Sequence, residues 1–536
     1  MIAKRLNFPS KLAIAFSGGV LMGLTVAPVN AWWLAWVALV PLWVLIRLHV
    51  SDPGSQFSQW LYPLFWAFGY YGLAIAWIRD LHPLTWMGVP WLASVAIALF
   101  AWGAITLWGG ALVSFWGWSF RFLLNRGKIL LPHRLGSEST LSLGLPLLSV
   151  LLGTALWCLT EGLWSQSALW WASLSFTQSP HNLPILHLGQ LSGPNAVTGA
   201  IVAVNGLLAE AWLYYSSSSR NRIAQGLLTI TLTLLLTLHG IGAWLYTRPL
   251  VELPNSQLNI GIIQGNIPTR IKLFEEGVRR AVKAYTDGYR TLAAQGVDAV
   301  LMPEGALPYF WVGMNRSRDP LYQAILQAGI PTWIGTPGLE NGKVTQSLFT
   351  IAGNGEIVSR YDKIKPVPLG EYLPFEPILG KVIRRLSPVE LSMIPGSRHQ
   401  HVDTPFGRAI AGICFDSAFA YIFRDQAATG GQFILTASNN DPYGAAMMAQ
   451  HHAQDIMRSI ESDRWAVRAT NTGFSGVVDP HGNTIWISDF RTYETHIATI
   501  YRRQTQTLFV RWGDWLTPTL LAIAGLGLLK RMKDEA

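Results

Sequence analysis

Residues 347–363, "SLFTIAGNGEIVSRYDK", decide how the second half of this chain folds. Apolar and polar residues alternate on both sides of Asn354-Gly355. This dipeptide is the strongest short signal for a β-hairpin, because its residues accept the positive φ angles of a tight turn. The stretch therefore predicts two antiparallel strands, and Lys363 lies where the second strand ends.

Outward from this hairpin, short apolar runs rich in β-branched residues alternate with longer polar stretches of helical period. The predicted helices cover about 274–296, 317–329 and 445–462. Strands that alternate with helices in this way indicate an α/β domain of about 250 residues. The predicted strands besides the hairpin are 258–266, 298–305, 331–336, 408–416, 432–440, 465–473, 475–483 and 484–489.

The first half of the chain has a different character. Half of the 536 residues are hydrophobic and only 13% are charged, against about 25% charged residues in an ordinary soluble domain. Apolar runs long enough to cross a bilayer as helices of roughly 20 residues recur up to residue 250, and one more closes the chain. These eight predicted spans are about 11–28, 31–49, 60–78, 88–120, 143–164, 186–214, 225–247 and 514–530.

The basic residues give these spans an orientation. With a cytoplasmic N-terminus, the inside segments hold thirteen Lys and Arg residues, whereas the short outside loops hold Arg79 alone. This asymmetry is the positive-inside pattern, and it accounts for the net charge of +9 without a nucleic-acid partner. Seven spans then place residues 251–510 outside the cytoplasm, with the eighth span and a cytoplasmic tail in 511–536. The thirteen inside residues are Lys4, Arg5, Lys11, Arg47, Arg121, Arg126, Lys128, Arg134, Arg220, Arg222, Lys530, Arg531 and Lys533.

Three chemically capable residues each follow an apolar strand of the α/β domain. Glu304 follows "VLMP", Lys363 closes the hairpin, and Cys414 stands where a strand gives way to a helix. Active-site groups in α/β folds gather beyond the carboxyl ends of strands. A thiolate can act as nucleophile, a desolvated carboxylate as proton acceptor and donor, and an ammonium as partner of an oxyanion.

Taken singly, each of these residues also has a structural explanation. Cys414 can be a small buried hydrophobe, Glu304 a cap, and Lys363 a solvated hairpin charge for which Lys365 competes. Cys158 lies in an apolar run and is interpreted as packing, and a disulfide with Cys414 is not expected. His451 and His452 are interpreted as structural or solvent-facing.

The order of the three residues with their flanks resembles the nitrilase superfamily, with Glu in "PEG", Lys in "YDK" and Cys in "GICFD". The stretches "QGNIP", "MPEGALP", "YDKIKPVPLGEYLPFE" and "RATNTGFSGVVDPHG", together with the plan of spans, narrow the resemblance to the integral-membrane apolipoprotein N-acyltransferase family. The resemblance covers essentially the whole chain. It implies an α-β-β-α sandwich and a catalytic triad of Glu304, Lys363 and Cys414.

The resemblance also implies supporting roles for Glu371 and Asp416. Prolines fix φ along the loop between Lys363 and Glu371 and hold both charges in place. The family often has Glu where this chain has Asp416. Other positions depart from the family pattern in the same way: Leu273 for Trp, Gln346 for Asn, Phe415 for Tyr, and Pro442 for Trp.

The function implied by the resemblance is transfer of a fatty acyl chain from a phospholipid, through a Cys414 thioester, to the N-terminal amine of diacylglyceryl-cysteine in apolipoproteins. The expected location is the bacterial inner membrane with the catalytic domain in the periplasm. No metal or other cofactor is expected, because the sequence shows neither a zinc-spaced His/Cys cluster nor a phosphate loop. Two alternatives remain open: a membrane-anchored amidase that uses water as second nucleophile, and a transporter or receptor whose outer domain only binds.

Overall fold

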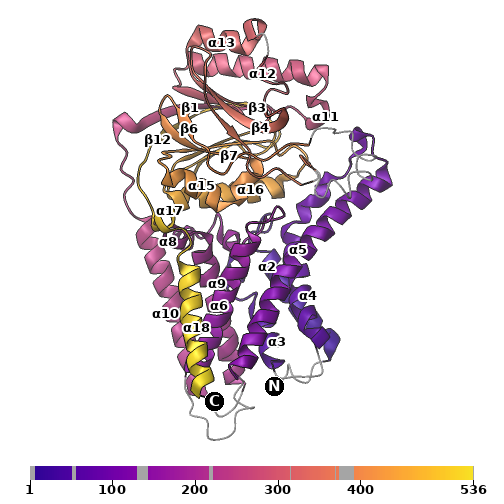
Figure 1. The fold of residues 1–536 in the computed structure, drawn as a ribbon, viewed down its shortest axis with the longest axis vertical. Helices are drawn as coiled ribbons and strands as arrows, with labels where there is room; N and C mark the ends of the chain where they lie inside the picture. The colour runs from indigo at the N-terminus through magenta and orange to yellow at the C-terminus, as the bar shows by residue number, and fades with distance from the viewer. Residues whose placement is uncertain are drawn as a thin grey trace. The chain divides into compact units, whose positions relative to one another are not determined.

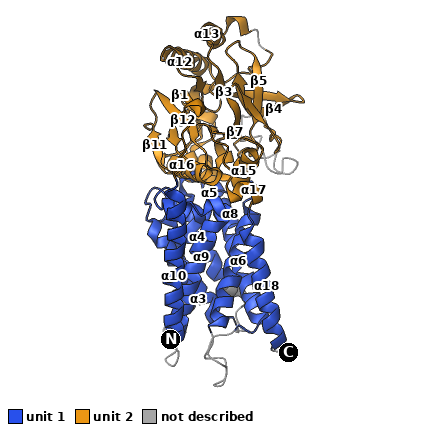
Figure 2. Cartoon of the chain, turned by 90° about the vertical axis from the view of Figure 1, so that its left-hand side faces the viewer, with its two compact units in different colours: residues 1–78, 99–248, 514–536 blue, residues 79–98, 249–513 orange. Residues whose placement is uncertain are grey.

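The computed structural model describes residues 7–50, 56–129, 143–216, 221–313, 316–368, 370–372 and 392–534. The chain divides into two compact units, coloured separately in Figure 2. Unit 1 contains Met1–Ile78, Leu99–Arg248 and Asp514–Ala536, and unit 2 contains Arg79–Ala98 and Pro249–Gly513. Four of the basic residues used above for orientation, Lys4, Arg5, Arg134 and Arg220, lie outside the described residues.

Unit 1 is helical, and a helix lies in each apolar run predicted from the sequence (Figure 1). Among the described residues, four helices are long and apolar enough to cross a membrane: α5 (Trp91–Arg126), α6 (Gly144–Trp164), α9 (Pro194–Tyr215) and α10 (Asn221–Tyr246). The predicted count of eight spans is therefore not confirmed. The remaining apolar runs contain α2 (Phe8–Gly23), α3 (Val40–Leu48) after the 3₁₀ turn η1 (Trp32–Trp36), α4 (Gln56–Ala74) and α18 (Leu516–Asp534).

Small residues let two of these helices approach closely. A Cβ on Gly19 of α2 would lie 1.8 Å from the carbonyl oxygen of Trp66 in α4. A Cβ on Gly69 of α4 would lie 2.5 Å from the carbonyl oxygen of Phe16. Glycine is thus required on both sides of this contact, as is typical of helices that pack backbone to backbone in membranes.

Arg47, one of the basic residues of the predicted inside segments, lies in the last turn of α3 and is only 2% exposed. Its Nε lies 2.6 Å from Oε1 of Glu210 in α9. The apolar run extends past Arg47 because the buried carboxylate neutralises the guanidinium, which hydropathy alone does not reveal.

Unit 2 contains two sheets that each have six strands within the described residues. The first sheet has the order β12 (Glu494–Tyr501), β1 (Gln257–Gln264), β2 (Ala299–Leu301), β3 (Thr332–Glu340), β4 (Lys343–Ile351) and β5 (Ile357–Asp362). The second has the order β11 (Thr484–Ile487), β10 (Gly476–Val478), β9 (Ala466–Thr470), β8 (Ile434–Ser438), β7 (Gly407–Ile413) and β6 (Val402–Thr404). Strands β1, β2 and β3 run parallel to one another in the first sheet, and β7, β8 and β9 do so in the second. The strands next to each of these sets are antiparallel to it.

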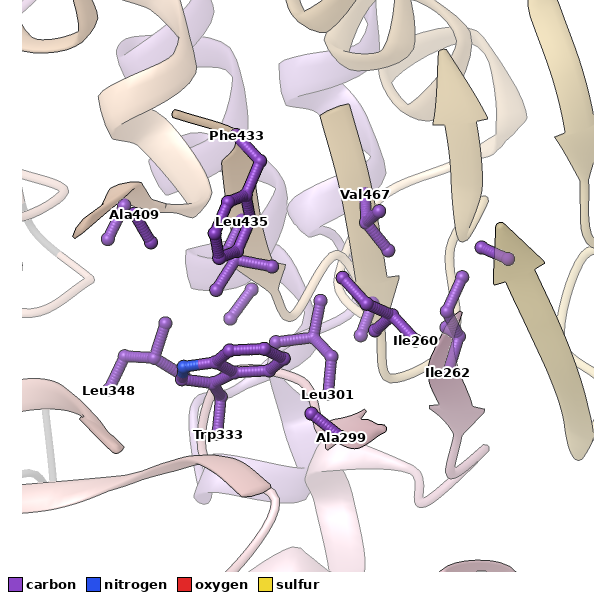
Figure 3. Packing of buried hydrophobic residues seen from close by; sticks show 14 of the residues in the cluster. Ile260, Ile262, Ala299, Leu301, Trp333, Leu348, Ala409, Phe433, Leu435 and Val467 are labelled. Atoms are coloured by element: carbon purple, nitrogen blue, oxygen red, sulfur yellow. The ribbon is translucent and has the colours of Figure 1, made fainter. Parts of the chain in front are cut away.

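The two sheets of unit 2 pack face to face, and helices cover their outer faces (Figure 1). Figure 3 shows Trp333 and Leu301 of the first sheet directed toward Leu435 of β8 and toward Phe433, which directly precedes β8. Helices α12 (Glu275–Ala294) and α13 (Pro320–Ala328) bury their apolar faces on the other side of the first sheet. Helices α15 (Ala420–Ala428) and α16 (Ala445–Ser462) lie on the second sheet. This is an α-β-β-α sandwich.

The hairpin predicted around Asn354-Gly355 is confirmed. Strands β4 and β5 pair antiparallel, and Gly355 has φ of +82° in the turn between them. The three predicted helices are confirmed as α12, α13 and α16. Two strands were not predicted from the sequence. They are β6 and β12, and β12 pairs along its whole length with β1.

Candidate active site

The nucleophile candidate, Cys414, lies directly after β7 and opens the short 3₁₀ turn η8 (Cys414–Ala418). Its φ is +48°, in the left-handed region that side chains other than glycine rarely occupy. Such strained residues persist only where the surrounding structure holds them, and they cluster at active sites. Cys414 is 7% exposed, so its thiol lies in a nearly dry site at the carboxyl end of a parallel strand.

Glu304 reaches the same place from the first sheet. It follows β2 by a short turn, and that turn packs against β3 at Gly335, where a Cβ would lie 2.1 Å from the carbonyl oxygen of Pro303. Both carboxylate oxygens are engaged. Oε1 lies 2.9 Å from Nζ of Lys363, and Oε2 accepts a 2.8 Å hydrogen bond from the backbone N–H of Asn439.

Lys363 follows β5 and continues the strand pairing, because its N–H donates to the carbonyl oxygen of Gln346 at 2.8 Å. Its side chain is 1% exposed, and its ammonium contacts Glu304 and also Glu371, at 2.6 Å. The second oxygen of Glu371 accepts from the N–H of Val367 at 2.8 Å, which anchors the carboxylate to its own loop. Of the loop 361–376, residues 369 and 373–376 lie outside the described residues.

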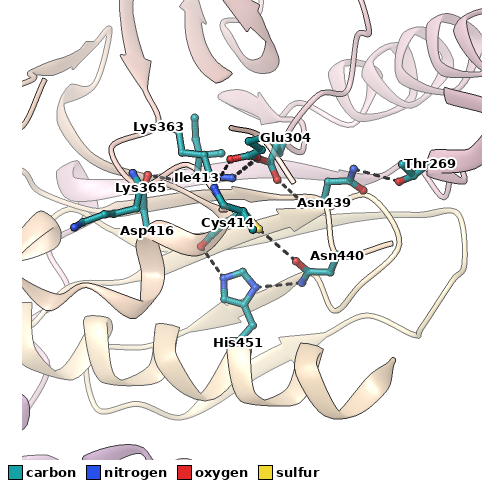
Figure 4. Close-up of polar contacts among 12 residues, drawn as sticks. Thr269, Glu304, Lys363, Lys365, Ile413, Cys414, Asp416, Asn439, Asn440 and His451 are labelled. Carbon is teal, nitrogen blue, oxygen red and sulfur yellow. Dashed lines mark hydrogen bonds and ion pairs between the residues drawn. The ribbon is translucent and has the colours of Figure 1, made fainter. Parts of the chain in front are cut away.

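Lys365, the competitor of Lys363, points elsewhere. Its Nζ lies 4.6 Å from the ring centroid of Phe419 and 5.8 Å from that of Tyr421. Figure 4 shows Lys363, Glu304 and Cys414 directed toward one another, with the Lys365 side chain turned away. The structure thus brings together the three residues predicted as the triad.

Burial dominates the electrostatics of this site. It raises the pKa of the Cys414 thiol well above its ordinary value, and the charge of Glu304 adds to this effect although Lys363 opposes it. Burial alone would lower the pKa of Lys363, but Glu304 and Glu371 together raise it well above the ordinary value. Burial also raises the pKa of Glu371, against the effect of Lys363. At neutral pH the site therefore holds a protonated thiol beside a permanent ammonium, and the thiol needs a base before it can attack.

Asp416 supports the turn that carries the nucleophile. Its Oδ2 accepts hydrogen bonds from the N–H of Ile413 at 3.0 Å and the hydroxyl of Tyr361 at 2.9 Å. Its Oδ1 accepts from the N–H of Lys365 at 2.8 Å. The carboxylate therefore connects the turn at Cys414 to the strand and loop that carry Lys363.

Three polar residues next to the triad were not predicted from the sequence to be part of the site. The Lys272 ammonium, at the end of the short helix α11 (Thr269–Lys272), lies 3.3 Å from the carbonyl oxygen of Glu304 and is 7% exposed. Asn440 accepts from the Cys414 thiol at 3.7 Å, and His451 contacts both Asn440 and the Cys414 carbonyl. "SNN" at the end of a strand is a visible signal for Asn440, but only the folded structure shows which face of α16 carries His451.

The positions that depart from the family pattern lie in different surroundings. Leu273 is 78% exposed, whereas Gln346 is buried, with its Nε2 unpartnered among the described residues. The Phe415 ring lies 5.0 Å from that of Phe419, edge to face.

His451 and His452 are both buried, so neither faces solvent.

Two family models match this chain. Residues 259–508 match the carbon-nitrogen hydrolase family, and residues 18–207 match the N-terminal domain of apolipoprotein N-acyltransferase. The apolipoprotein N-acyltransferase of Nostoc sp. is 53% identical, covering 94% of this chain and 96% of the relative. That of Synechocystis sp. is 44% identical, covering 95% of this chain and 98% of the relative.

Among solved structures, an amidase from Nesterenkonia sp. is similar over 47% of this chain and 94% of its own, with a TM-score of 0.36 and 17% identity. Nit3 of Saccharomyces cerevisiae, a member of the nitrilase superfamily, is similar over 47% of this chain and 92% of its own, with a TM-score of 0.36 and 15% identity.

Proposed function

The chain belongs to the apolipoprotein N-acyltransferase family, and on that premise we propose that Cys414 carries a fatty acyl chain from a phospholipid to the N-terminal amine of a diacylglyceryl-cysteine apolipoprotein. The observation that carries the proposal is the convergence of Glu304, Lys363 and Cys414 in one buried site.

In the first half-reaction the Cys414 sulfur attacks the ester carbonyl of the phospholipid. Glu304 accepts the thiol proton as the S–C bond forms. Lys363 faces the developing oxyanion, and a fixed positive charge in a dry site stabilises it strongly. The ester C–O bond then breaks, Glu304 returns the proton to the leaving lysophospholipid oxygen, and an acyl thioester remains on Cys414.

In the second half-reaction the apolipoprotein amine attacks the thioester carbonyl. The C–N bond forms, the C–S bond breaks, and Glu304 takes the proton from the nitrogen and returns it to sulfur. The products are an amide on the lipoprotein and a free thiol. Glu304 therefore serves alternately as base and acid, while Lys363 keeps its proton throughout, in agreement with its raised pKa.

The protein is a membrane protein, and the proposal places it in the bacterial inner membrane. Residues 1–250 form the helical bundle, 251–510 the catalytic domain on the periplasmic side, and 511–536 the last span and a cytoplasmic tail. Both substrates carry lipid chains whose exposure to water is unfavourable, so an enzyme embedded in the bilayer can receive them without extracting them. Labelling of single cysteines placed at Lys283 and Lys533 in intact cells tests this topology, since only the first should react with an impermeant reagent.

The decisive experiment compares Cys414→Ala with Cys158→Ala, which removes the buried cysteine of α6 outside the site. Mass spectrometry of the N-terminal lipopeptide of a substrate lipoprotein should show loss of the third acyl chain only in Cys414→Ala. An unchanged lipopeptide in Cys414→Ala cells that lack another such enzyme would refute the proposal and favour a transporter or receptor.

A second experiment separates transfer from hydrolysis. Purified enzyme given phospholipid alone should accumulate acyl-Cys414, and addition of a diacylglyceryl-cysteine peptide should discharge it. Rapid release of free fatty acid without the peptide would instead identify an amidase-like hydrolase.

A further inference from the structure

Two polar residues outside the proposed triad, Asn440 and His451, lie behind the Cys414 nucleophile (Figure 4). The His451 ring on α16 has Nε2 2.8 Å from the carbonyl oxygen of Cys414 and Nδ1 3.2 Å from Nδ2 of Asn440. Oδ1 of Asn440 in turn lies 3.7 Å from the Cys414 sulfur. His451 and Asn440 are both fully buried.

These contacts assign the tautomer of His451 and the orientation of the Asn440 amide group. A carbonyl oxygen only accepts hydrogen bonds, so Nε2 of His451 carries the proton and donates to Cys414. In a neutral imidazole the other nitrogen is then an acceptor. Asn440 must therefore point its NH₂ group toward His451, which leaves its carbonyl oxygen toward the sulfur.

The imidazole stays neutral over the working pH range. Burial, followed by the nearby charge of Arg468, lowers the pKa of His451 to about 3, although Asp455 opposes this shift. Asp455 is itself paired with Arg468 at 2.5 Å. The orientation of Asn440 is therefore the same at pH 6 and at pH 9.

An amide oxygen that faces sulfur accepts a hydrogen bond from a thiol but repels a thiolate. The reverse orientation would place an N–H donor against sulfur and stabilise the thiolate. We propose that His451 is a positioning residue that locks Asn440 with its oxygen toward Cys414, so that the nucleophile rests as a thiol until the acyl donor arrives. On binding of the donor, the proton leaves the bond to Asn440 and passes to Glu304 as sulfur bonds to the acyl carbon.

A resting thiol has a chemical advantage for an enzyme on the oxidising side of a membrane. Thiolates, not thiols, are the forms that attack peroxides and disulfides and so become oxidised. By disfavouring the thiolate, His451 and Asn440 keep Cys414 unreactive except when Glu304 and a bound ester act together. This inference rests on the proposed role of Cys414 as nucleophile.

The test measures the rate at which iodoacetamide alkylates Cys414 in the full-length purified enzyme as a function of pH, with peptide mapping to exclude Cys158. Other ionisable groups that face the sulfur are Glu304, Lys363, Glu371 and Tyr443, and all variants keep them. His451→Gln is the matched control, because its amide can donate to the Cys414 carbonyl and accept from Asn440. His451→Leu removes both bonds and frees Asn440 to rotate.

We expect the alkylation midpoint of His451→Leu to fall by on the order of one pH unit, whereas that of His451→Gln stays at the wild-type value. An unchanged midpoint in His451→Leu, or an equal shift in both variants, would overturn the inference. Asn440→Asp gives a second, independent readout, because a carboxylate facing sulfur should raise the midpoint. A midpoint in Asn440→Asp at or below the wild-type value would show that this side chain does not face the thiol.

Alkylation requires no acyl transfer, so the two proposals fail separately. If Cys414→Ser retained transferase activity, the proposed function would be wrong while the alkylation profiles still reported on His451. If the profiles did not shift but Cys414→Ala lost activity, only the inference would be wrong.

Discussion

Glu371 lies 2.6 Å from the Lys363 ammonium, and Lys363 also contacts Glu304 at 2.9 Å. The buried Lys363 ammonium is thus shared by two carboxylates. Glu304 in addition accepts a hydrogen bond from the backbone N–H of Asn439, which follows β8. Glu371 therefore balances part of the Lys363 charge, which is the supporting role proposed for it.

Replacement of Lys363 by Met should therefore be more damaging than replacement of Glu371 by Gln. Lys363→Met leaves two carboxylates in a dry site, which should destabilise the protein by about 3–5 kcal/mol and reduce kcat by at least roughly 100-fold. Glu371→Gln keeps the pair between Lys363 and Glu304, so a smaller loss is expected. Transfer rates and thermal unfolding check both, with Lys365→Met as control. Equal losses for Lys363→Met and Lys365→Met would contradict the assignment.

The Asp416 carboxylate predicts an order of stabilities. Tyr361→Phe removes one hydrogen bond and leaves Oδ2 with the N–H of Ile413, so it should cost about 1 kcal/mol. Asp416→Ala removes the acceptor of the buried Ile413 N–H and of the half-buried Lys365 N–H, and it should cost several times more. Denaturation of the purified enzymes measures the order, and a Tyr361→Phe cost equal to that of Asp416→Ala would show that the hydroxyl bond dominates.

Lys272 predicts a dependence of stability on pH. Burial lowers the pKa of its ammonium to about 8, despite the nearby charges of Glu304 and Asp441, whereas in the unfolded chain it titrates near 10.4. Between these values the unfolded state binds one more proton, so stability rises with pH. Wild type should gain stability relative to Lys272→Met between about pH 8 and pH 10.

Thermal unfolding at pH 7.5 and at pH 9.5 measures this difference. Lys283→Met is the matched control, because that α12 lysine has a 75% exposed side chain and pairs only with Asp287 of its own helix among the described residues. A constant difference between wild type and Lys272→Met across this range would be inconsistent with a buried ammonium.

The ion pair inside the helical unit gives a prediction about the bundle. Glu210 contacts Arg47 at 2.6 Å and accepts from Ser149 at 2.7 Å and Trp43 at 3.1 Å. Arg47→Met leaves the carboxylate buried without a cation and should destabilise the protein by about 3–5 kcal/mol. The double variant Arg47→Met/Glu210→Gln should regain part of this loss in detergent unfolding, and a double variant no more stable than Arg47→Met would indicate that the two residues act independently.

Local signals predicted the α/β domain and its hairpin, whereas the sandwich and the triad were implied by the family resemblance. Asn354-Gly355 determines a hairpin from two adjacent residues, and Glu304, Lys363 and Cys414 each follow an apolar strand. Strand β12 has no such signal: alternation in "ETHIATIY" is short, and only pairing with β1, more than 200 residues earlier, makes it a strand. His451 was interpreted as structural or solvent-facing for the same reason, since its partner Cys414 belongs to a distant segment.

Hydropathy predicts where the helices of the membrane part lie better than it predicts which of them span the membrane. Each predicted apolar run contains a helix, but among the described residues four helices are long and apolar enough to cross a membrane, so the count of eight is not confirmed. The burial of Arg47 has no signal in its own segment, because its partner Glu210 lies in another helix.

The pairing of Gln257 with Tyr501 joins the first residue of β1 to the last residue of β12. The first strand and the last strand of the sandwich are therefore hydrogen-bonded to each other. The segments before β1 and after β12 therefore leave the sandwich from neighbouring points at one edge of the first sheet.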